Sequence, residues 1–312
     1  MFLDDPWITI AIPSYNRTDL LRRTVQSVQD QSVSGWECVI VDDVSDDGAW
    51  EVAQLLAEQD SRVVAYRHDR NIGLAANFRD CGTKGTAPYV LMLAADDQLN
   101  RHFLDQIKKA IEAQPDAGLF CARRVQLTSG NRMRPYATPM TGVWQKGTTI
   151  ARAMANGNLY GLYSSVVIRR QALVDVGGIR DDNPWAGDYE AFVKISARHP
   201  VMFIPAATVC QHVDSSTQTT AFLRSGVLVK YEAMTLERLL EDSDVSQYLT
   251  NDDVRAGWTR IQALRWAVIL YNLSHGQRPE TENMRYSAVK SSSRRIIMTL
   301  FRLVYQRWRL TY

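Results

Sequence analysis

Short apolar segments alternate with amphipathic helical segments over residues 1–125. The apolar segments span 8–12, 38–41, 63–66 and 89–93. Between them, over 20–28 and 74–81, apolar residues recur at the spacing of a helix with one buried face. This alternation predicts parallel strands joined by crossover helices, that is, a doubly wound α/β sheet.

Polar residues follow three of the predicted strands. They occupy 13–17 after the first strand, 42–47 after the second, and Asp96 and Asp97 after the fourth. The carboxyl ends of parallel strands lie along one edge of a sheet, and ligands of open α/β sheets bind there. We therefore expect these three segments to converge on one crevice.

The pattern changes in the second half of the chain. Residues 122–185 are irregular and rich in Gly, Asn, Tyr and Trp, with one predicted strand at 165–168, and such segments often contact substrates. Helical periodicity returns over 227–240 and 254–273. We predict an α/β domain over 1–218, with halves 1–121 and 122–218, and a helical C-terminal extension over 219–312.

The composition argues against several classes of function. Of 312 residues, 46% are hydrophobic and 22% are charged, and the net charge of +2 is too small to indicate nucleic-acid binding. The four cysteines show neither zinc-site spacing nor a dense disulfide framework. The sequence has no signal-peptide pattern and no apolar stretch of about 18 residues. We expect a cytoplasmic protein with no nucleic-acid partner.

Two acidic clusters stand at predicted strand ends. Asp96 and Asp97 offer the carboxylate oxygens that Mg²⁺ and Mn²⁺ prefer, although a solvated turn or a helix cap is the alternative. The carboxylates within 42–47 can accept hydrogen bonds from a base or from ribose hydroxyls, or can cap the next helix. Core packing requires neither cluster, so their presence in one sheet favours a ligand site.

Three segments match a known family in order and spacing. They are Pro13, Tyr15, Asn16 and Arg17; then Gln31 and the stretch 39–47; then Asn71, Gly73 and Asn77. They resemble the P-x-Y-N-R, Q…IVDD-x-S-x-D and N-x-G-x-x-x-N segments of the inverting glycosyltransferases of family 2. The resemblance covers residues 7–215 and implies the GT-A fold, a Rossmann-like, mostly parallel sheet flanked by helices.

This resemblance implies a donor site. Asp43 would hold the nucleotide base, Asp96 the ribose, and Asp97 a divalent metal, Mn²⁺ or Mg²⁺, that bridges the diphosphate of a nucleotide-sugar donor. Further donor contacts would come from Pro13, Tyr15, Arg17, Asn71 and Asn77. Residues 1–121 would then form the nucleotide-sugar and metal half, and 122–218 the acceptor half.

The metal site departs from the common family pattern. Ala94 stands where many members have an earlier acid. The form without that acid resembles the bacterial spore-coat member and leaves Asp97 as the main protein ligand. His212 lies near a region in which many members have a histidine over the donor phosphates. It is a candidate metal ligand or phosphate contact, although a lone histidine is more often structural.

Asp188 is the expected catalytic base. An inverting transfer needs one base that removes the acceptor proton as the hydroxyl attacks the anomeric carbon. Gly187 replaces the glutamate of the family's E-D pair, Asp188 retains its carboxylate, and Glu190 is the rival base. Asp188 can instead cap the helix that follows, and both roles can hold together.

Aromatic residues of the acceptor half can form a platform for a sugar ring. Trp144, Tyr160, Tyr163 and Trp185 are the candidates, and Glu190 is a further acceptor candidate. Ordinary packing is the alternative for the four aromatic residues.

The tail over 294–310 is amphipathic, and the chain from Arg285 onward has seven basic residues and no acidic ones. Such a helix binds a membrane interface or packs on a second subunit. We favour a peripheral position on the inner face of the cell membrane, where a lipid-linked acceptor would be presented, and keep a homodimer as the alternative.

The resemblance thus implies a hexosyl- or deoxyhexosyl-transferase. It would move a sugar from a UDP- or dTDP-sugar, with inversion, to a hydroxyl of a glycan, glycolipid or glycoprotein in cell-surface polysaccharide biosynthesis. A non-catalytic nucleotide-binding scaffold is one alternative. A sugar nucleotidyltransferase is less consistent with the sequence, because segment 13–17 contains no glycine with which to cradle a triphosphate.

Overall fold

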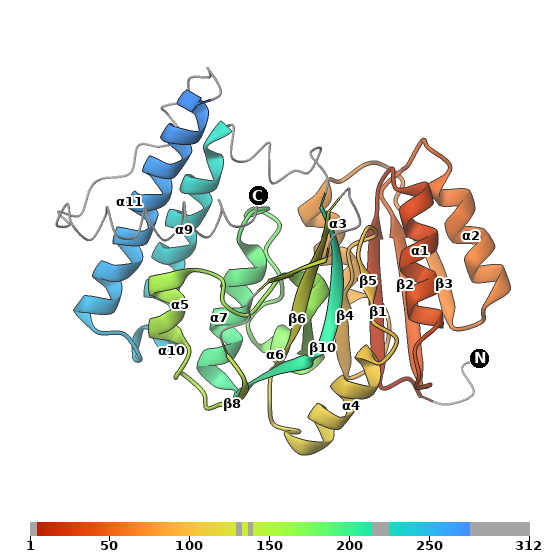
Figure 1. The fold of residues 1–312 in the computed structure, drawn as a ribbon, viewed down its shortest axis with the longest axis horizontal. Coiled ribbons are helices and arrows are strands. Elements are labelled where there is room, and N and C mark those ends of the chain that lie inside the picture. Colours follow the sequence, from red (N-terminus) through yellow and green to blue (C-terminus); the bar gives the residue numbers. More distant parts are fainter. Residues whose placement is uncertain (1–4, 129–132, 137–139, 214–224, 275–312) are drawn as a thin grey trace.

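The computed structural model describes residues 5–128, 133–136, 140–213 and 225–274, which form a mixed α/β structure around one central sheet (Figure 1). The predicted fold class is therefore confirmed. No helix among these described residues is long and apolar enough to cross a bilayer. The tail at 294–310 lies outside the described residues, so its membrane or dimer role remains a prediction.

The first half alternates strands and helices as predicted. The strands are β1 (Ile8–Ser14), β2 (Trp36–Asp42), β3 (Val63–Arg67) and β4 (Tyr89–Met92), and the helices are α1 (Thr18–Gln29), α2 (Ala49–Gln59) and α3 (Leu74–Thr83). These strands are parallel, in the spatial order β3-β2-β1-β4. Every residue of β1 and β2 is buried, as expected for parallel strands covered on both faces.

The second half extends the same sheet. Its elements are β5 (Gln98–Leu99), α4 (Phe103–Ala113), β6 (Leu119–Thr128), β7 (Met133–Tyr136), β8 (Gly142–Trp144), α5 (Ile150–Asn156), the 3₁₀ helix η1 (Tyr163–Ser165), β9 (Val166–Arg169), α6 (Arg170–Asp175), α7 (Gly187–Arg198) and β10 (Val201–Val213). Strand β9 is antiparallel to both β4 and β6, and β10 is parallel to β6. The carboxyl ends of β1, β2, β4 and β10 therefore lie along one edge.

The described residues form two hydrophobic cores. One contains residues of α1, α2 and α4, and the other contains residues of α3, α5 and α7. The second core continues into the helices α9 (Val227–Glu241), α10 (Ser243–Ser246) and α11 (Asn251–Ser274), through residues such as Leu236 and Ile261. The helices predicted at 227–240 and 254–273 are thus present, and they share a core with the α/β part.

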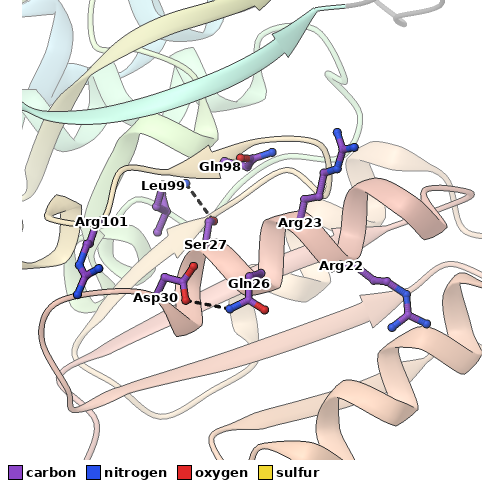
Figure 2. Close-up of a pocket in the computed structure, with 8 residues that line it drawn as sticks. All are labelled: Arg22, Arg23, Gln26, Ser27, Asp30, Gln98, Leu99 and Arg101. Atoms are coloured by element: carbon purple, nitrogen blue, oxygen red, sulfur yellow. Dashed lines mark hydrogen bonds between the residues drawn. The ribbon is translucent and has the colours of Figure 1, made fainter. Parts of the chain in front are cut away.

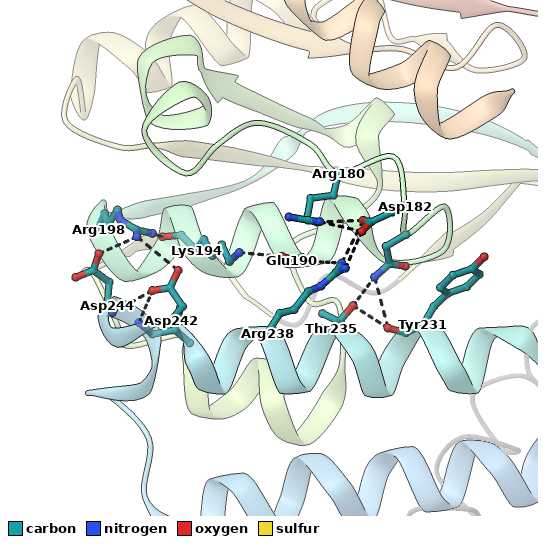
Figure 3. Close-up of polar contacts among 12 residues, drawn as sticks. Arg180, Asp182, Glu190, Lys194, Arg198, Tyr231, Thr235, Arg238, Asp242 and Asp244 are labelled. Carbon is teal, nitrogen blue, oxygen red and sulfur yellow. Dashed lines mark hydrogen bonds and ion pairs between the residues drawn. The ribbon is translucent and has the colours of Figure 1, made fainter. Parts of the chain in front are cut away.

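A polar network fastens α9 to α7 and to the loop before it (Figure 3). Arg238 of α9 pairs with Asp182 at 2.7 Å and with Glu190 of α7 at 3.4 Å. Glu190 also pairs with Lys194, one helical turn further along α7, at 2.8 Å. Because Asp188 lies at the beginning of α7, this network fixes the helix that carries the expected base.

Candidate active site

The carboxyl edge of the sheet brings the predicted donor residues together. Ser14 and Asp42 are paired in register at the ends of β1 and β2. The backbone N–H of Asp43 donates to the Ser14 carbonyl at 2.9 Å. The turn that carries Asp96 and Asp97 follows β4, which pairs with β1 on its other side. The predicted convergence of three polar segments on one edge is therefore observed.

Asp43 organises the loop before α3. Its Oδ1 accepts the backbone N–H of Ile72 at 2.8 Å, and its Oδ2 accepts that of Gly73 at 2.9 Å. The side-chain amide of Asn71 donates to the Asp43 carbonyl at 3.1 Å. The buried carboxylate keeps further lone pairs, so the expected contact to a nucleotide base is compatible with this role.

The backbone on both sides of this crevice is strained. Val44, directly after Asp43, has φ 63°, and Asn16, directly after Tyr15, has φ 50°. A positive φ is unusual for a β-branched residue such as Val44 and costs on the order of 1–3 kcal/mol. Such strain clusters at functional sites.

Two other acids of 42–47, Asp42 and Asp47, have structural partners. Asp42 accepts hydrogen bonds from Ser45 and forms an ion pair with Arg67 at 3.3 Å. Asp47 accepts the N–H of Thr18 at 3.1 Å and that of Ala49 at 3.0 Å, so one carboxylate serves the beginnings of both α1 and α2. Gly48 and Arg17 are the N-cap residues, so Asp47 supports both helix beginnings from outside the N-cap position, whereas Asp43 remains the donor candidate.

The remaining donor candidates divide into two groups. Pro13 is buried in β1, whereas Tyr15 is 47% exposed and Arg17 is half-buried, so these two side chains can reach a ligand. Asn77 is buried, and its amide donates to the carbonyls of Ser14 at 3.4 Å and Val41 at 3.3 Å. Asn77 therefore holds the ends of β1 and β2, a positioning role.

The turn with Asp96 and Asp97 is held from two directions. The Thr24 hydroxyl of α1 donates to the carbonyls of Ala95 at 3.0 Å and Asp97 at 2.8 Å. The Ser164 hydroxyl of η1 accepts the N–H of Ala94 at 3.0 Å. Asp97 is buried and Asp96 half-buried, and their carboxylate oxygens suit Mg²⁺ or Mn²⁺.

Strand β10 brings a third segment to this turn. Cys210 pairs in register with Gln98, the residue after Asp97. Burial and the negative charge of Asp97 raise the pKa of the Cys210 thiol. His212 follows two residues later, but its side chain lies outside the described part. Within the described residues, no group of three His, Cys, Asp or Glu side chains could hold a metal.

A basic groove of about 540 Å³ adjoins the same turn on the α1 side (Figure 2). It is lined by Arg22, Arg23, Gln26, Ser27, Asp30, Gln98, Leu99 and Arg101. Gln98 links the groove to the turn, because it follows Asp97 directly.

Asp188 is buried in the first turn of α7 and lies near Tyr163 of η1, the element whose Ser164 supports the turn after β4. Its Oδ1 accepts the N–H of Tyr189 at 2.6 Å, and its Oδ2 accepts the Asn158 amide at 3.4 Å. Burial raises the pKa of Asp188 to about 7; the Tyr189 N–H opposes this, Glu232 adds to it, and Arg124 opposes it. A carboxyl group with a pKa near neutrality is suited to general base catalysis.

Asp188 does not occupy the N-cap position of α7, which was the alternative to its role as the base. Residue Ala186 occupies the N-cap, and Asp188 lies inside the helix. The Asn183 side chain accepts the N–H of Ala186 at 3.0 Å and so supports the chain just before α7. Asp188 nevertheless accepts the N–H of Tyr189 in the first turn of α7, so its carboxylate also serves the start of this helix.

Two of the acceptor candidates lie elsewhere. Tyr160 is 1% exposed, and its hydroxyl bonds to Thr149 and Ser196, so it is a core residue. Trp144 pairs with Val201, the first residue of β10, which is the edge opposite the crevice. Neither side chain can form a sugar platform beside Asp188, because one is enclosed and the other is distant.

Two further acceptor candidates, Trp185 and Glu190, flank Asp188 in the sequence. The Trp185 indole N–H donates to Glu232 of α9 at 3.1 Å, and the ring is only half-buried, so a sugar contact remains a prediction. Glu190 is 1% exposed and pairs with Lys194 and Arg238. These ion pairs indicate a structural role for Glu190 and favour Asp188 as the base.

Near the candidate base, Asn158 and Ser164 have no distinct signal in the sequence, whereas Tyr163 is one of the predicted aromatic candidates. Asn158 bonds to Asp188, and Tyr163, whose pKa is raised by burial and then by Asp188, stacks on Phe78 of α3 with ring centroids 4.7 Å apart. Ser164 supports the turn after β4. The irregular composition of 122–185 predicts substrate contacts in this segment but does not identify Asn158 or Ser164.

Comparison with known proteins identifies the class. Among solved structures, S. aureus TarS 1–349 in complex with UDP-GlcNAc gives a TM-score of 0.64 at 13% identity, covering 97% of this chain and 91% of that one. The mannosyltransferase PcManGT from Pyrobaculum calidifontis, in complex with GDP-Man and Mn²⁺, gives 0.61 at 16% identity, covering 99% and 82%. The fold is that of the GT-A glycosyltransferases.

The chain belongs to glycosyl transferase family 2, whose model matches residues 9–177. The uncharacterized protein MT1568 of Mycobacterium tuberculosis (strain CDC 1551 / Oshkosh) is 26% identical over 242 residues, 74% of this chain and 75% of that protein. TuaG of Bacillus subtilis (strain 168), named provisionally as a teichuronic acid biosynthesis glycosyltransferase, is 34% identical over 107 residues. That match covers 34% of this chain and 41% of TuaG.

Proposed function

We propose that this glycosyltransferase transfers a sugar, with inversion, from a nucleoside diphosphate sugar to a hydroxyl of a cell-surface glycan or a lipid-linked glycan. The observation that carries the proposal is Asp188, a buried carboxyl group with a pKa of about 7, together with the buried carboxylates of Asp43 and Asp97. TuaG, named for teichuronic acid biosynthesis, supports the acceptor class.

In this proposal each residue has one role in a single displacement reaction. Asp43 and Tyr15 bind the nucleoside, and the strained segments at Asn16 and Val44 fix the crevice. Asp97 would hold Mn²⁺ or Mg²⁺, which when bound neutralises charge on the leaving diphosphate. Asp188 removes the proton from the acceptor hydroxyl as the hydroxyl oxygen forms the new bond to the anomeric carbon and the bond from that carbon to the diphosphate oxygen breaks.

Calorimetric titration with UDP, dTDP and GDP, with and without Mn²⁺, tests the donor site. The proposal expects binding of one nucleotide that depends on the metal and is lost in Asp97→Asn. Asp105→Asn, which alters an exposed i,i+4 ion pair on α4, is the matched control. Absence of binding by all three nucleotides would overturn the proposal.

Donor hydrolysis separates a transferase from a non-catalytic scaffold. A transferase releases free sugar slowly in the absence of acceptor, and Asp188→Asn should reduce that rate by roughly 10²–10⁴, the usual contribution of a general base. Saturable nucleotide binding without any sugar release would instead establish the scaffold.

A further inference from the structure

The helical extension inserts a buried ion pair beside Asp188. Arg260 of α11 is 6% exposed, and its guanidinium lies 2.9 Å from Glu232 of α9. Arg260 also donates from Nε to the Met154 carbonyl of α5 at 3.1 Å and lies over the Tyr189 ring of α7 at 5.9 Å. One side chain thus joins four helices next to the residue that follows Asp188.

Glu232 extends this pair toward the base. One carboxylate oxygen pairs with Arg260, and the other accepts the indole N–H of Trp185, three residues before Asp188. Its negative charge acts on Asp188 and raises the pKa of that carboxyl, in addition to the larger effect of burial. The negative charge of Glu232 on α9 therefore influences the ionisation of Asp188 at the beginning of α7.

Stability alone does not account for this pair. Removing two charges from water costs several kcal/mol per ion, and well-packed apolar residues at such positions are often as stabilising. The α7–α9 contact already has apolar packing and the Arg238 network at another point along the helix. At the end of α7 that carries Asp188, a buried charge pair supplies charges that apolar residues at the same positions could not.

We propose that Glu232 and Arg260 are positioning residues that set the protonation of Asp188, so that the helical extension completes the active site. Other charged and titratable groups also act on Asp188: Arg124 from β6 opposes the effect of Glu232, and Tyr163 of η1 lies close enough for its own pKa to be raised by Asp188. The catalytic role of Asp188 rests on the proposed function, whereas the coupling of its protonation to Glu232 does not.

Carbon-13 carboxyl NMR of the full chain, labelled at aspartate, tests the coupling without activity. The Asp188 resonance is assigned by its loss in Asp188→Asn. Glu232→Gln keeps the size and the acceptor for Trp185 but leaves Arg260⁺ alone, so the Asp188 pKa should fall by at least about 0.5 pH unit. Arg260→Met leaves Glu232⁻ without its counter-charge and should shift the pKa upward.

Two controls separate tuning from a purely structural role. Arg198→Met breaks ion pairs with Asp242 and Asp244 at the other end of α7 and should leave the Asp188 pKa unchanged. Glu232→Asp keeps the charge and should retain most of the shift. If Glu232→Gln folds and leaves the Asp188 pKa within about 0.2 pH unit of wild type, the proposal is overturned. If Glu232→Gln does not fold, Arg260→Met is decisive: an upward shift of the Asp188 pKa supports the proposal, and no shift or a downward shift overturns it.

The pH dependence of donor hydrolysis then distinguishes this proposal from the proposed function. In an active enzyme, the acidic limb of kcat/KM should move with the NMR pKa in Glu232→Gln. An NMR shift in a protein that shows no turnover would retain the coupling and overturn only the transferase reaction.

Discussion

The raised pKa of Asp188 has a consequence for stability. An aspartate with a pKa of 3.8 in the unfolded chain and about 7 in the folded protein binds more protons when folded between these values. Its contribution to the free energy of unfolding is therefore most favourable below pH 4, declines as the pH rises, and is at its minimum above pH 7. The residue proposed as the base is thus a source of instability at neutral pH.

Asp188→Asn should separate function from stability. The substitution removes a buried charge, so at about pH 8 the free energy of unfolding should rise by roughly 2–4 kcal/mol, with little change near pH 4. Asparagine retains an acceptor for the Tyr189 N–H. Denaturant unfolding at both pH values checks this, and an equal change at both would show that the ionisation of Asp188 is not the cause.

The same carboxyl predicts the pH dependence of the reaction. A base must be deprotonated to accept a proton, so the rate of donor hydrolysis should increase with pH and level off above pH 7, where Asp188 is mostly ionised. A rate profile under saturating donor measures this. A plateau that already begins near pH 5 would contradict the assignment of Asp188 as the base.

Val44 offers a test of backbone strain at the donor crevice. Asn tolerates a positive φ better than Val, so Val44→Asn should raise the free energy of unfolding by about 1 kcal/mol. Val64→Asn, at a half-buried position in β3, should instead destabilise the protein. Urea unfolding compares the two, and a loss of stability in Val44→Asn would show that side-chain packing outweighs the strain.

At the scale of elements, Asp47 joins two helices at one point. Its two oxygens accept the N–H groups of Thr18 and Ala49, at the beginnings of α1 and α2. Capping bonds of this kind contribute about 1 kcal/mol each, so Asp47→Ala should cost about 1–2 kcal/mol. Asp46→Ala alters the exposed neighbouring acid and serves as the control in the same urea titrations. If the two substitutions lowered the free energy of unfolding equally, Asp47 would not stabilise the beginnings of both helices.

Elements with local periodicity could be predicted from the sequence, whereas long-range partners could not. The strands at 8–12 and 38–41 and the helices at 227–240 and 254–273 follow from spacing alone and are present. Trp144 was misplaced as an acceptor contact because β8 pairs with the beginning of β10, and nothing near Trp144 encodes that pairing.

The candidate site shows the same division. Asp43, Asp97 and Asp188 could be proposed as site residues because each belongs to a short motif, and all three are buried in the structure. Glu190 was harder to interpret, because its partner Arg238 is 48 residues away. The burial of Tyr160 was not predictable locally, because its ring packs against Phe192 and Phe203 and its hydroxyl bonds to Ser196, 36 residues away.

At the scale of the whole molecule, the predicted boundary between 218 and 219 does not separate two cores. Residues of α9 and α11 belong to the same hydrophobic core as residues of α7 and β6. Arg238 adds a polar link across this contact, with a side chain only 23% exposed. We therefore expect the helical extension and the α/β part to unfold together.

Arg238→Met tests this cooperativity. In this variant Asp182 still pairs with Arg180, and Glu190 still pairs with Lys194. Because Asp182 is also half-exposed, the free energy of unfolding should fall by only about 1–2 kcal/mol. Lys109→Met, which breaks an exposed pair on α4, should cost at most about 0.5 kcal/mol. Native-state hydrogen exchange should show the Arg238→Met loss equally in β1 and α9, because both open in one global event. A loss confined to α9 and α11 would establish the extension as a separate folding unit.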